Sequence, residues 1–255
     1  MRHVRFMLPG SDHPKVGTLG KETVFDGQKE YPLEKVRLLA PCIPTKIICL
    51  GRNYAAHAQE LGNPLPERPL LFFKPPSAVI GPGEEIVLPP SSRVDYEAEL
   101  AIIIDRRCRN VRAKDAMEVL RGYTCMNDVS DREAQEWDKN WVRAKGFDTS
   151  APLGPAVVTK DEIEGPFHVV LRLNGEIRQD GSTSDLVFSI PEIIAEITAY
   201  ITLEPGDVIA TGTPAGVGPL SPGDTVEVMI EGIGTLTNPV RAVSDLQKPP
   251  ARKTL

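Results

Sequence analysis

The stretch Val94–Ile104, with the sequence VDYEAELAIII, combines alternating carboxylates with a run of aliphatic residues. Asp95, Glu97 and Glu99 occupy every second position. Because successive side chains of a β-strand point to opposite faces, the pattern predicts one strand that carries three carboxylates on the same face. The aliphatic run that follows predicts that this strand continues into a core. The carboxylates are therefore expected at the mouth of that core.

Three neighbouring carboxylates repel one another, and their burial without partners costs several kcal/mol each. A hard divalent cation, Mg²⁺ or Mn²⁺, would balance them because such cations prefer carboxylate oxygens. The alternative is an ordinary solvated strand face. A further carboxylate, Asp128, follows a predicted strand at residues 123–127. We expect Ser130 to Glu133 to form a capping box at the start of a short helix. Asp128 would then lie at the end of a strand and just before a helix N-terminus, where it is well placed as another ligand.

The composition is that of a globular protein and argues against some classes of partner. Of 255 residues, 41% are hydrophobic and 25% are charged, as in ordinary globular proteins. The net charge of −6 argues against nucleic acid as a partner, because no basic stripe is present to neutralise phosphates. The 21 glycines and 24 prolines favour many short strands over a helical bundle.

Two further features predict a cytoplasmic protein with no membrane partner. No apolar stretch reaches the ~18 residues that a membrane-spanning helix needs. The cysteines have no close pairing pattern, so they are expected to be reduced thiols that form neither disulfides nor a zinc site. The cysteines are Cys42, Cys49, Cys108 and Cys125.

The chain divides into three expected parts. Residues 1–43 predict a small β-rich N-terminal extension of short strands, with prolines at 41 and 44 interrupting the chain after it. We expect residues 44–245 to form the main domain and residues 246–255 to form a disordered tail. Within this domain we expect a helix at residues 113–121 and a loop at residues 141–155. We also expect a hairpin with its turn at Asn174-Gly175, and a helix that begins with a capping box at Ser189 to Glu192.

A candidate catalytic pair follows the predicted buried strand at residues 46–50. A short helix is expected after Gly51, ending at Gly62, and within it His57 and Glu60 are three residues apart and share a face. An imidazole held by a carboxylate is a standard general base. The alternative is an incidental pair on a surface helix.

Seven stretches, in order, resemble the fumarylacetoacetate hydrolase family, in particular its shorter bacterial-type members, over roughly residues 45–240. These stretches are GRNYAAHAQELG (51–62), FFKPPSAVIGPG (72–83), DYEAELAIII (95–104), GYTCMNDVSDREAQ (122–135), RAKGFDTSAPLGP (143–155), LRLNGEIRQ (171–179) and PGDVIATGTPAGVG (205–218). The resemblance implies a mainly β (α+β) fold, in which mixed β-sheets roll around one another with a few short helices. It also implies a homodimer and a single Mg²⁺ or Mn²⁺.

The resemblance assigns roles to individual residues. It makes Glu97, Glu99 and Asp128 the metal ligands and leaves Asp95 as a neighbour. It makes His57 and Glu60 the general-base pair and places Lys145 beside the metal. It places Arg132 and Gln135 on the substrate side, together with Thr213 in the glycine-rich loop at 211–218. Arg52 and Lys74 are, by their charge, candidates for holding a distal carboxylate of the substrate.

The expected reaction is cleavage of a C–C bond, by hydrolysis or decarboxylation, in an acylpyruvate-like or 2-oxo-dicarboxylate substrate through a metal-stabilised enolate. The alternative within the family is isomerisation of 2-hydroxyhepta-2,4-diene-1,7-dioate or decarboxylation of 5-oxopent-3-ene-1,2,5-tricarboxylate in aromatic catabolism. Two other classes stay open. One is a non-catalytic, metal-stabilised binding protein, and the other is an aldolase that forms a Schiff base through Lys145.

Overall fold

Twelve strands form the largest sheet of the computed structural model, which describes residues 1–243. In spatial order the sheet runs β4-β3-β2-β1-β14-β12-β11-β17-β6-β7, with β5 paired to β1 and β8 paired to β14. Its strands are β1 (Arg2–Met7), β2 (Lys15–Leu19), β3 (Thr23–Phe25), β4 (Glu30–Pro32), β5 (Arg37–Leu39), β6 (Ile47–Gly51), β7 (Leu70–Lys74), β8 (Val79–Ile80), β11 (Ala98–Ile104), β12 (Leu120–Asn127), β14 (Ala151–Thr159) and β17 (Val208–Ala210).

Two smaller sheets and a few short helices complete the described fold. The five-stranded sheet is made of β16 (Glu176–Ser182), β15 (His168–Leu173), β19 (Thr225–Ile230), β20 (Gly234–Ala242) and β9 (Ile86–Leu88). The three-stranded sheet is made of β13 (Ser130–Asp131), β10 (Val94–Tyr96) and β18 (Gly218–Pro219). The helices are α1 (Ala55–Glu60), α2 (Arg132–Trp137), α3 (Val142–Lys145) and α4 (Ile190–Tyr200), with 3₁₀ turns at Leu33–Lys35, Pro76–Ala78, Ala113–Glu118 and Thr183–Asp185. The expected mainly β architecture is confirmed.

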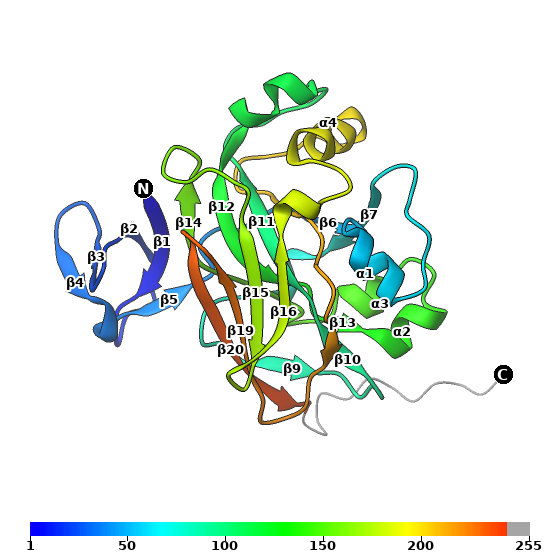
Figure 1. Cartoon of the computed structure of the whole chain (residues 1–255). Helices are drawn as coiled ribbons and strands as arrows, with labels where there is room; N and C mark the ends of the chain where they lie inside the picture. Colours follow the sequence, from blue (N-terminus) through cyan, green and yellow to red (C-terminus); the bar gives the residue numbers. More distant parts are fainter. Residues whose placement is uncertain (244–255) are drawn as a thin grey trace.

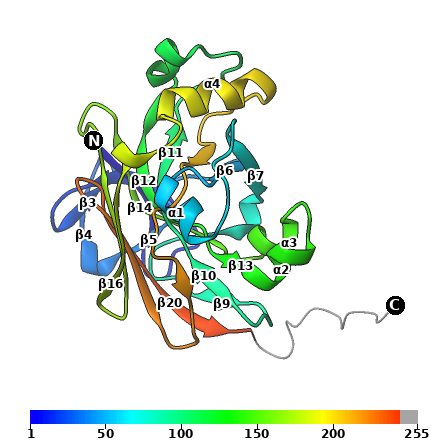
Figure 2. The same ribbon diagram turned by 45° about the vertical axis from the view of Figure 1, so that its right-hand side comes forward.

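The middle of the large sheet is buried on both faces. Along β11, Leu100, Ile102 and Ile104 belong to the core shared with the five-stranded sheet and α4. The alternate residues Ala101 and Ile103 belong to a second core on the other face. Two-sided burial explains why this strand is continuously aliphatic and does not alternate between apolar and polar residues. Figure 1 shows α1, α2 and α3 on the right-hand side of the molecule and α4 above them, and Figure 2 keeps α2 and α3 together at the right.

The N-terminal strands are part of the large sheet. They form the blue group beside β14 in Figure 1, and β1 pairs with β14 at Arg2↔Val158 and His3↔Val157. A small third core joins Phe6 and its neighbours to Ala156 of β14. The division near residue 43 stays a prediction. The predicted tail at 246–255 lies outside the described residues.

The stretch 94–104 was expected to be one strand, and that prediction is wrong at Glu97. β10 and β11 belong to different sheets, and Glu97 lies between them. Its N–H donates to Asn127 Oδ1 at 2.9 Å, and its carbonyl accepts from the N–H of Asp128 at 2.8 Å. Contacts with residues far along the chain therefore fix the break, which strand periodicity alone could not reveal.

Other local predictions had mixed outcomes. The hairpin at Asn174-Gly175 and the capping box of α4 are confirmed, with positive φ at both turn residues. The helix expected at 113–121 is a 3₁₀ turn that ends at Glu118, because β12 begins at Leu120 and pairs with β11. The loop expected at 141–155 contains α3 and the start of β14.

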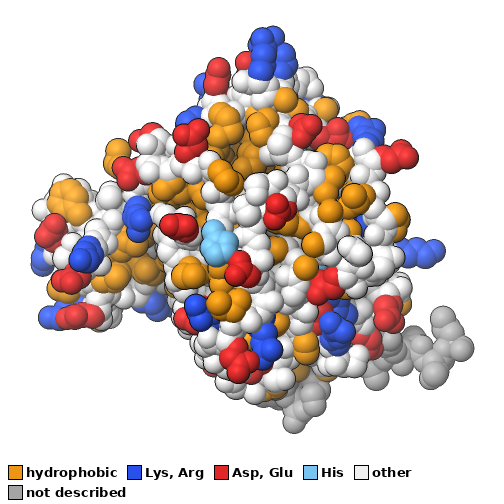
Figure 3. All heavy atoms as spheres, viewed as in Figure 1, with side chains coloured by type: hydrophobic (Ala, Val, Ile, Leu, Met, Phe, Trp, Pro, Cys, Tyr) orange, Lys and Arg blue, Asp and Glu red, His pale blue; other side chains and the backbone are white. Residues whose placement is uncertain are grey.

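The structure also bears on the predicted state of the cysteines and on the prediction that the chain has no membrane-spanning helix. All four cysteines are free thiols, as predicted. Among residues 1–243, no helix is long and apolar enough to cross a bilayer. On the face drawn in Figure 3, acidic and basic side chains are interspersed, and no basic stripe crosses that face.

Candidate metal centre and active site

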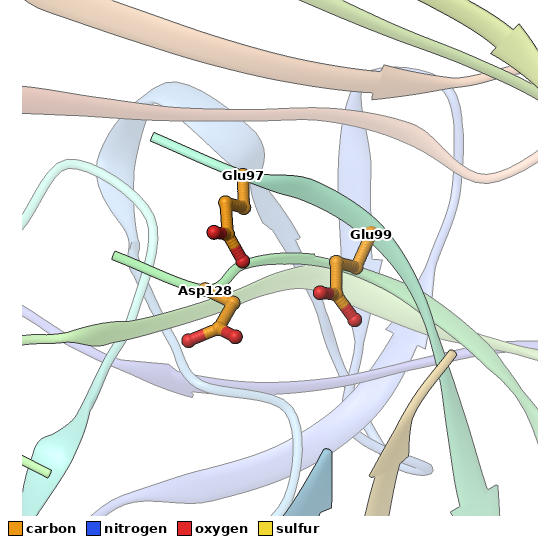
Figure 4. Close-up of side chains that lie close together, drawn as sticks. All are labelled: Glu97, Glu99 and Asp128. Atoms are coloured by element: carbon orange, nitrogen blue, oxygen red, sulfur yellow. The ribbon is translucent and has the colours of Figure 1, made fainter. Parts of the chain in front are cut away.

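Glu97, Glu99 and Asp128 converge on one point at the ends of two paired strands. β11 pairs with β12 so that Ala98 faces Asn127, which brings Asp128 beside the two glutamates. One ligand oxygen from each carboxylate lies within 4.8 Å of the others, and all three side chains are buried. Figure 4 shows the three carboxylates grouped around a common space. The resemblance predicted this group of three residues, whereas the strand pattern had placed Asp95 on the same face as the two glutamates.

The charges and hydrogen bonds of the triad fit a divalent cation. Glu99 Oε2 accepts a hydrogen bond from the N–H of Gly212 at 2.7 Å, whereas the buried Glu99 Oε1 has no hydrogen-bond partner within residues 1–243. Burial raises the pKa of Glu99 well above its usual range, and the charges of Asp128 and Glu97 raise it further. An unpartnered oxygen among like charges is costly, and a hard cation would satisfy it. The three carboxylates thus form a suitable donor set for Mg²⁺ or Mn²⁺.

Two buried lysines flank Asp128, and they occupy different positions. Lys145 Nζ lies 2.8 Å from Glu97 Oε2, 2.7 Å from Asp128 Oδ2 and 2.5 Å from Ser130 Oγ. Lys74 Nζ forms an ion pair with the other oxygen, Asp128 Oδ1, at 2.8 Å. It also donates to the carbonyls of Lys145 and two further residues and does not line the cavity described below. Lys145 therefore faces the site, whereas Lys74 supports Asp128 from within the core.

Lys145 and Arg132 determine how Glu97 ionises. Burial favours the neutral form of Glu97, but Lys145 and Arg132 outweigh it and hold the pKa of Glu97 well below its usual range. Burial also disfavours the charged form of Lys145, but Asp128 and Glu97 outweigh this effect and raise the pKa of Lys145. Glu97 is therefore a carboxylate and Lys145 an ammonium at neutral pH.

Asp95 is separated from the triad by arginines. Arg93 donates to both of its oxygens at 2.8 and 3.0 Å, and Arg132 Nε donates to Asp95 Oδ2 at 2.8 Å. Arg132 also reaches Glu97 Oε1 with Nη2 at 2.6 Å and donates from Nη1 to Gln135 Oε1 at 3.0 Å. Asp95 is thus a neighbour that orients Arg132. The N-cap of α2 is Asp131, whose side chain accepts from the N–H of Ala134 at 2.9 Å, and not the expected Ser130, whose hydroxyl contacts Lys145.

A cavity of about 260 Å³ opens against this cluster. It brings together seven of the residues singled out from the sequence, which are Arg52, His57, Glu97, Arg132, Gln135, Lys145 and Thr213. The others lie beside it: Glu60 behind His57, Glu99 and Asp128 beside Glu97, and Lys74 behind Asp128. The side chains of Phe72 and Trp141 form an apolar wall in edge-to-face contact, with ring centroids 5.5 Å apart. Sequence reasoning missed this wall because the two aromatic residues come from segments 69 positions apart.

The candidate base pair is assembled on α1. His57 Nδ1 lies 3.2 Å from Glu60 Oε2, and His57 is buried against the cavity. Glu60 Oε1 accepts from the N–H of Gly216 at 3.0 Å, so the same carboxylate connects α1 to the glycine-rich loop. With Nδ1 facing Glu60, the Nε2 atom of His57 is the ring nitrogen that can exchange a proton with a ligand.

Comparisons with known proteins identify the family to which this fold belongs. Residues 46–241 match the sequence model of a protein family described as "Fumarylacetoacetate (FAA) hydrolase C-terminal". The chain belongs to the fumarylacetoacetate hydrolase family. It is 42% identical over 222 residues to the human mitochondrial oxaloacetate tautomerase FAHD2A, with 82% of this chain and 71% of that protein covered.

Two solved structures place this chain among enzymes with different reactions. 5-Carboxymethyl-2-hydroxymuconate delta-isomerase from Mycobacterium smegmatis is 45% identical with a TM-score of 0.87, covering 96% of this chain and 100% of that one. Maleylpyruvate hydrolase from Sphingobium sp. SYK-6, in complex with manganese (II) ion and pyruvate, is 33% identical with a TM-score of 0.81, covering 96% and 100%. The protein is therefore a metal-dependent enzyme of this family, whose relatives include isomerases, tautomerases and hydrolases.

Proposed function

We propose that the protein cleaves a C–C bond, by hydrolysis or decarboxylation, in an acylpyruvate-like or 2-oxo-dicarboxylate substrate. The observation that carries this proposal is one small cavity lined both by the carboxylate-held imidazole of His57 and by Glu97 of the acidic triad. A divalent cation held by Glu97, Glu99 and Asp128 would bind the carboxylate and 2-oxo oxygens and stabilise the charge that develops there. The manganese and pyruvate in the Sphingobium structure support this substrate class.

The residues of this chain supply binding and proton transfer. Lys145 adds a positive charge beside the developing negative charge, and Arg132 with Gln135 and Thr213 orient the substrate. In the hydrolytic reaction His57, held by Glu60, takes a proton from water as that water attacks the distal carbonyl. Arg52 lines the cavity and has no ion-pair or hydrogen-bond partner within residues 1–243, which supports it as the group that binds a distal carboxylate. The buried Lys74 instead keeps Asp128 in place.

A second candidate is keto–enol tautomerisation, or double-bond isomerisation of 2-hydroxyhepta-2,4-diene-1,7-dioate. Either reaction needs only a base that moves a proton between two atoms of the substrate, and His57 can supply it without a water nucleophile. The similarity to an oxaloacetate tautomerase and to a muconate isomerase favours this candidate.

A substrate panel distinguishes these reactions. Acetylpyruvate, oxaloacetate and 2-hydroxyhepta-2,4-diene-1,7-dioate are assayed with EDTA and then with Mg²⁺ or Mn²⁺ restored. Pyruvate release from the first two substrates supports cleavage. Enol–keto absorbance changes without pyruvate support tautomerisation, and turnover of the dienedioate alone supports isomerisation. Turnover that survives EDTA, with substrate trapped on Lys145 by borohydride, would support a Schiff-base aldolase.

We also propose that the protein is a cytoplasmic homodimer. The support is the resemblance to the family, in which homodimers are usual, together with four free thiols. Light scattering on the eluting peak of a gel-filtration column measures the mass. A mass near 27.9 kDa, that of one chain, would contradict the dimer.

A further inference from the structure

Gln179 connects the glycine-rich loop to the strand that carries the metal ligands. It lies on β16 in the five-stranded sheet and is buried. Its Oε1 accepts from the N–H of Ala98 at 2.9 Å, and Ala98 is the residue between Glu97 and Glu99. Its Nε2 donates to Thr213 Oγ1 at 2.7 Å and to the carbonyl of Pro214 at 2.8 Å. One amide side chain thus contacts both sides of the site.

The orientation of this amide is fixed by two backbone groups. The N–H of Ala98 can only donate, so it requires the oxygen of the amide. The carbonyl of Pro214 can only accept, so it requires the nitrogen. The usual ambiguity between the two ends of a glutamine amide is therefore absent here. The second hydrogen of Nε2 must then point to Thr213 Oγ1.

This polarity determines what the Thr213 hydroxyl can do. Because its oxygen accepts from Gln179, its single proton is left to donate elsewhere. Within residues 1–243, that proton has no hydrogen-bond acceptor, and Thr213 lines the cavity beside Glu97.

The glycine-rich loop also packs directly on β16. A Cβ added at Gly216 would lie 2.1 Å from the carbonyl oxygen of Arg178, and a Cβ at Gly181 would lie 2.5 Å from Pro214. The loop therefore has little freedom to turn Thr213 away from the cavity.

We infer that Gln179 is a positioning residue that fixes the Thr213 hydroxyl as a hydrogen-bond donor toward an anionic oxygen of a 2-oxo acid. This inference rests on the proposed function for its ligand class. Gln179 is an addition to the substrate-binding residues named above. It does not touch the substrate itself and acts only through Thr213. A hydrogen bond to a charged group is strong enough for its loss to be measured as about a 10-fold change in affinity or more.

The test is a double-mutant cycle on pyruvate binding to the Mn²⁺-loaded protein, measured by calorimetry. Gln179→Leu and Thr213→Val are each expected to weaken pyruvate binding about 10-fold, and the double variant no more than Thr213→Val alone. Thr213→Ser should restore binding. Gln179→Met keeps the length of the side chain but cannot donate to Thr213 Oγ1, so the Thr213 proton is no longer directed to the cavity and binding weakens. This variant carries the test if Gln179→Leu does not fold.

Thr211→Val is the matched control. Thr211 lies in the same loop and is buried, but its hydroxyl donates to the carbonyl of Leu100 at 2.9 Å. Its loss should lower the melting temperature and leave pyruvate affinity unchanged. Equal losses from Thr211→Val and Thr213→Val would overturn the inference, and so would losses that multiply in the double variant.

Two further readouts separate this inference from its alternatives. The Mn²⁺ affinity of the Gln179 variants should equal that of the wild type. A parallel fall would mean that Gln179 acts through the strand of Ala98, and the inference would be wrong. Pyruvate binding needs no turnover, so a wild type that binds pyruvate but turns over no substrate contradicts the proposed function alone. A wild type that does not bind pyruvate contradicts both.

Discussion

At the scale of single residues, the same chemical group has different roles within a few ångströms. Asp95 is held by Arg93 and Arg132, whereas Glu99 has an oxygen with no hydrogen-bond partner in the described chain. Within the triad, Glu99 is the member that has no lysine or arginine partner in the described chain, whereas Glu97 and Asp128 both pair with Lys145. Asp128 faces two ammonium groups, Lys74 at Oδ1 and Lys145 at Oδ2, so a cation bound at the triad would share this carboxylate with the lysines.

Replacing Glu99 should remove cation binding. Glu99→Gln replaces a negatively charged ligand with a neutral amide, so the attraction to the cation is weaker and Mn²⁺ affinity should fall about 100-fold or more. Mn²⁺ raises the melting temperature of a protein that binds it in the folded state. This rise is therefore expected in the wild type and in the exposed control Glu176→Gln, and not in Glu99→Gln. An equal Mn²⁺ shift in all three would refute the assigned triad.

Replacing His57 should separate catalysis from metal binding. His57→Ala removes the base and leaves the carboxylates in place, so kcat/KM should fall about 10²- to 10⁴-fold while Mn²⁺ affinity is retained. The exposed His168, which pairs with Asp180, provides the control His168→Ala with unchanged kcat/KM. Full turnover by His57→Ala would mean that the pair with Glu60 is idle and that the enzyme uses another base.

At the scale of elements, the site depends on how loops fasten the strand ends together. Glu60 joins α1 to the glycine-rich loop through Gly216, and Gln179 joins that loop to the start of β11. At the opposite end of the central strands, Asp207 fastens the start of β17 to the start of β6. Its Oδ1 accepts from the N–H and hydroxyl of Thr45 and from the N–H of Lys46.

Asp207→Asn should destabilise the protein in a pH-dependent manner. Burial favours the neutral acid, but the Lys46 ammonium and the N–H of Glu204 outweigh it and keep the pKa of Asp207 below its usual value. The stabilisation is thus present at pH values above the unfolded pKa of about 3.9 and is lost as the pH falls through the lower folded-state pKa. We expect a loss of about 1–3 kcal/mol at pH 7 that shrinks below about pH 4.

Urea unfolding at several pH values measures this difference. Asp12→Asn, at an exposed position, makes the same change in charge and should have no effect at any of these pH values. A difference between wild type and Asp207→Asn that is constant with pH would show that the carboxylate charge does not matter.

At the scale of the whole molecule, three cores share one large sheet. The site lies at the end of the strands between the two larger cores, and the third core joins β1 and β3 to Ala156 of β14. The N-terminal strands therefore stabilise the sheet without touching the site, because none of their residues lines the cavity.

Phe6→Ala should lower stability without changing the metal site. Phe6 is fully buried in the third core, so its truncation should cost about 3–5 kcal/mol in the free energy of unfolding. Phe25→Ala, at a half-exposed position of the same strands, should cost much less. Urea unfolding and Mn²⁺ calorimetry are the measurements. A changed Mn²⁺ affinity in Phe6→Ala would show that the N-terminal strands are coupled to the site.

Much of the site could be predicted from the sequence because short-range patterns encode it. The alternation of Glu97 and Glu99, the spacing of His57 and Glu60, and the resemblance carried by seven stretches singled out two groups of residues that the structure brings together. Turn chemistry predicted the hairpin at Asn174-Gly175, because positive φ there is a local property of two residues.

Only the tertiary structure decided which charged groups pair and which stay available. The break at Glu97 arises from hydrogen bonds to Asn127 and Asp128, about thirty residues away, and the burial of Lys74 arises from packing against Asp128. The role of Gln179 depends on two backbone groups that are more than thirty residues from it in the chain. These contacts are set by strand register and burial, which depend on residues distant in the sequence. The sequence by itself therefore determined which chemical groups the site contains, and the fold decided what each of them faces.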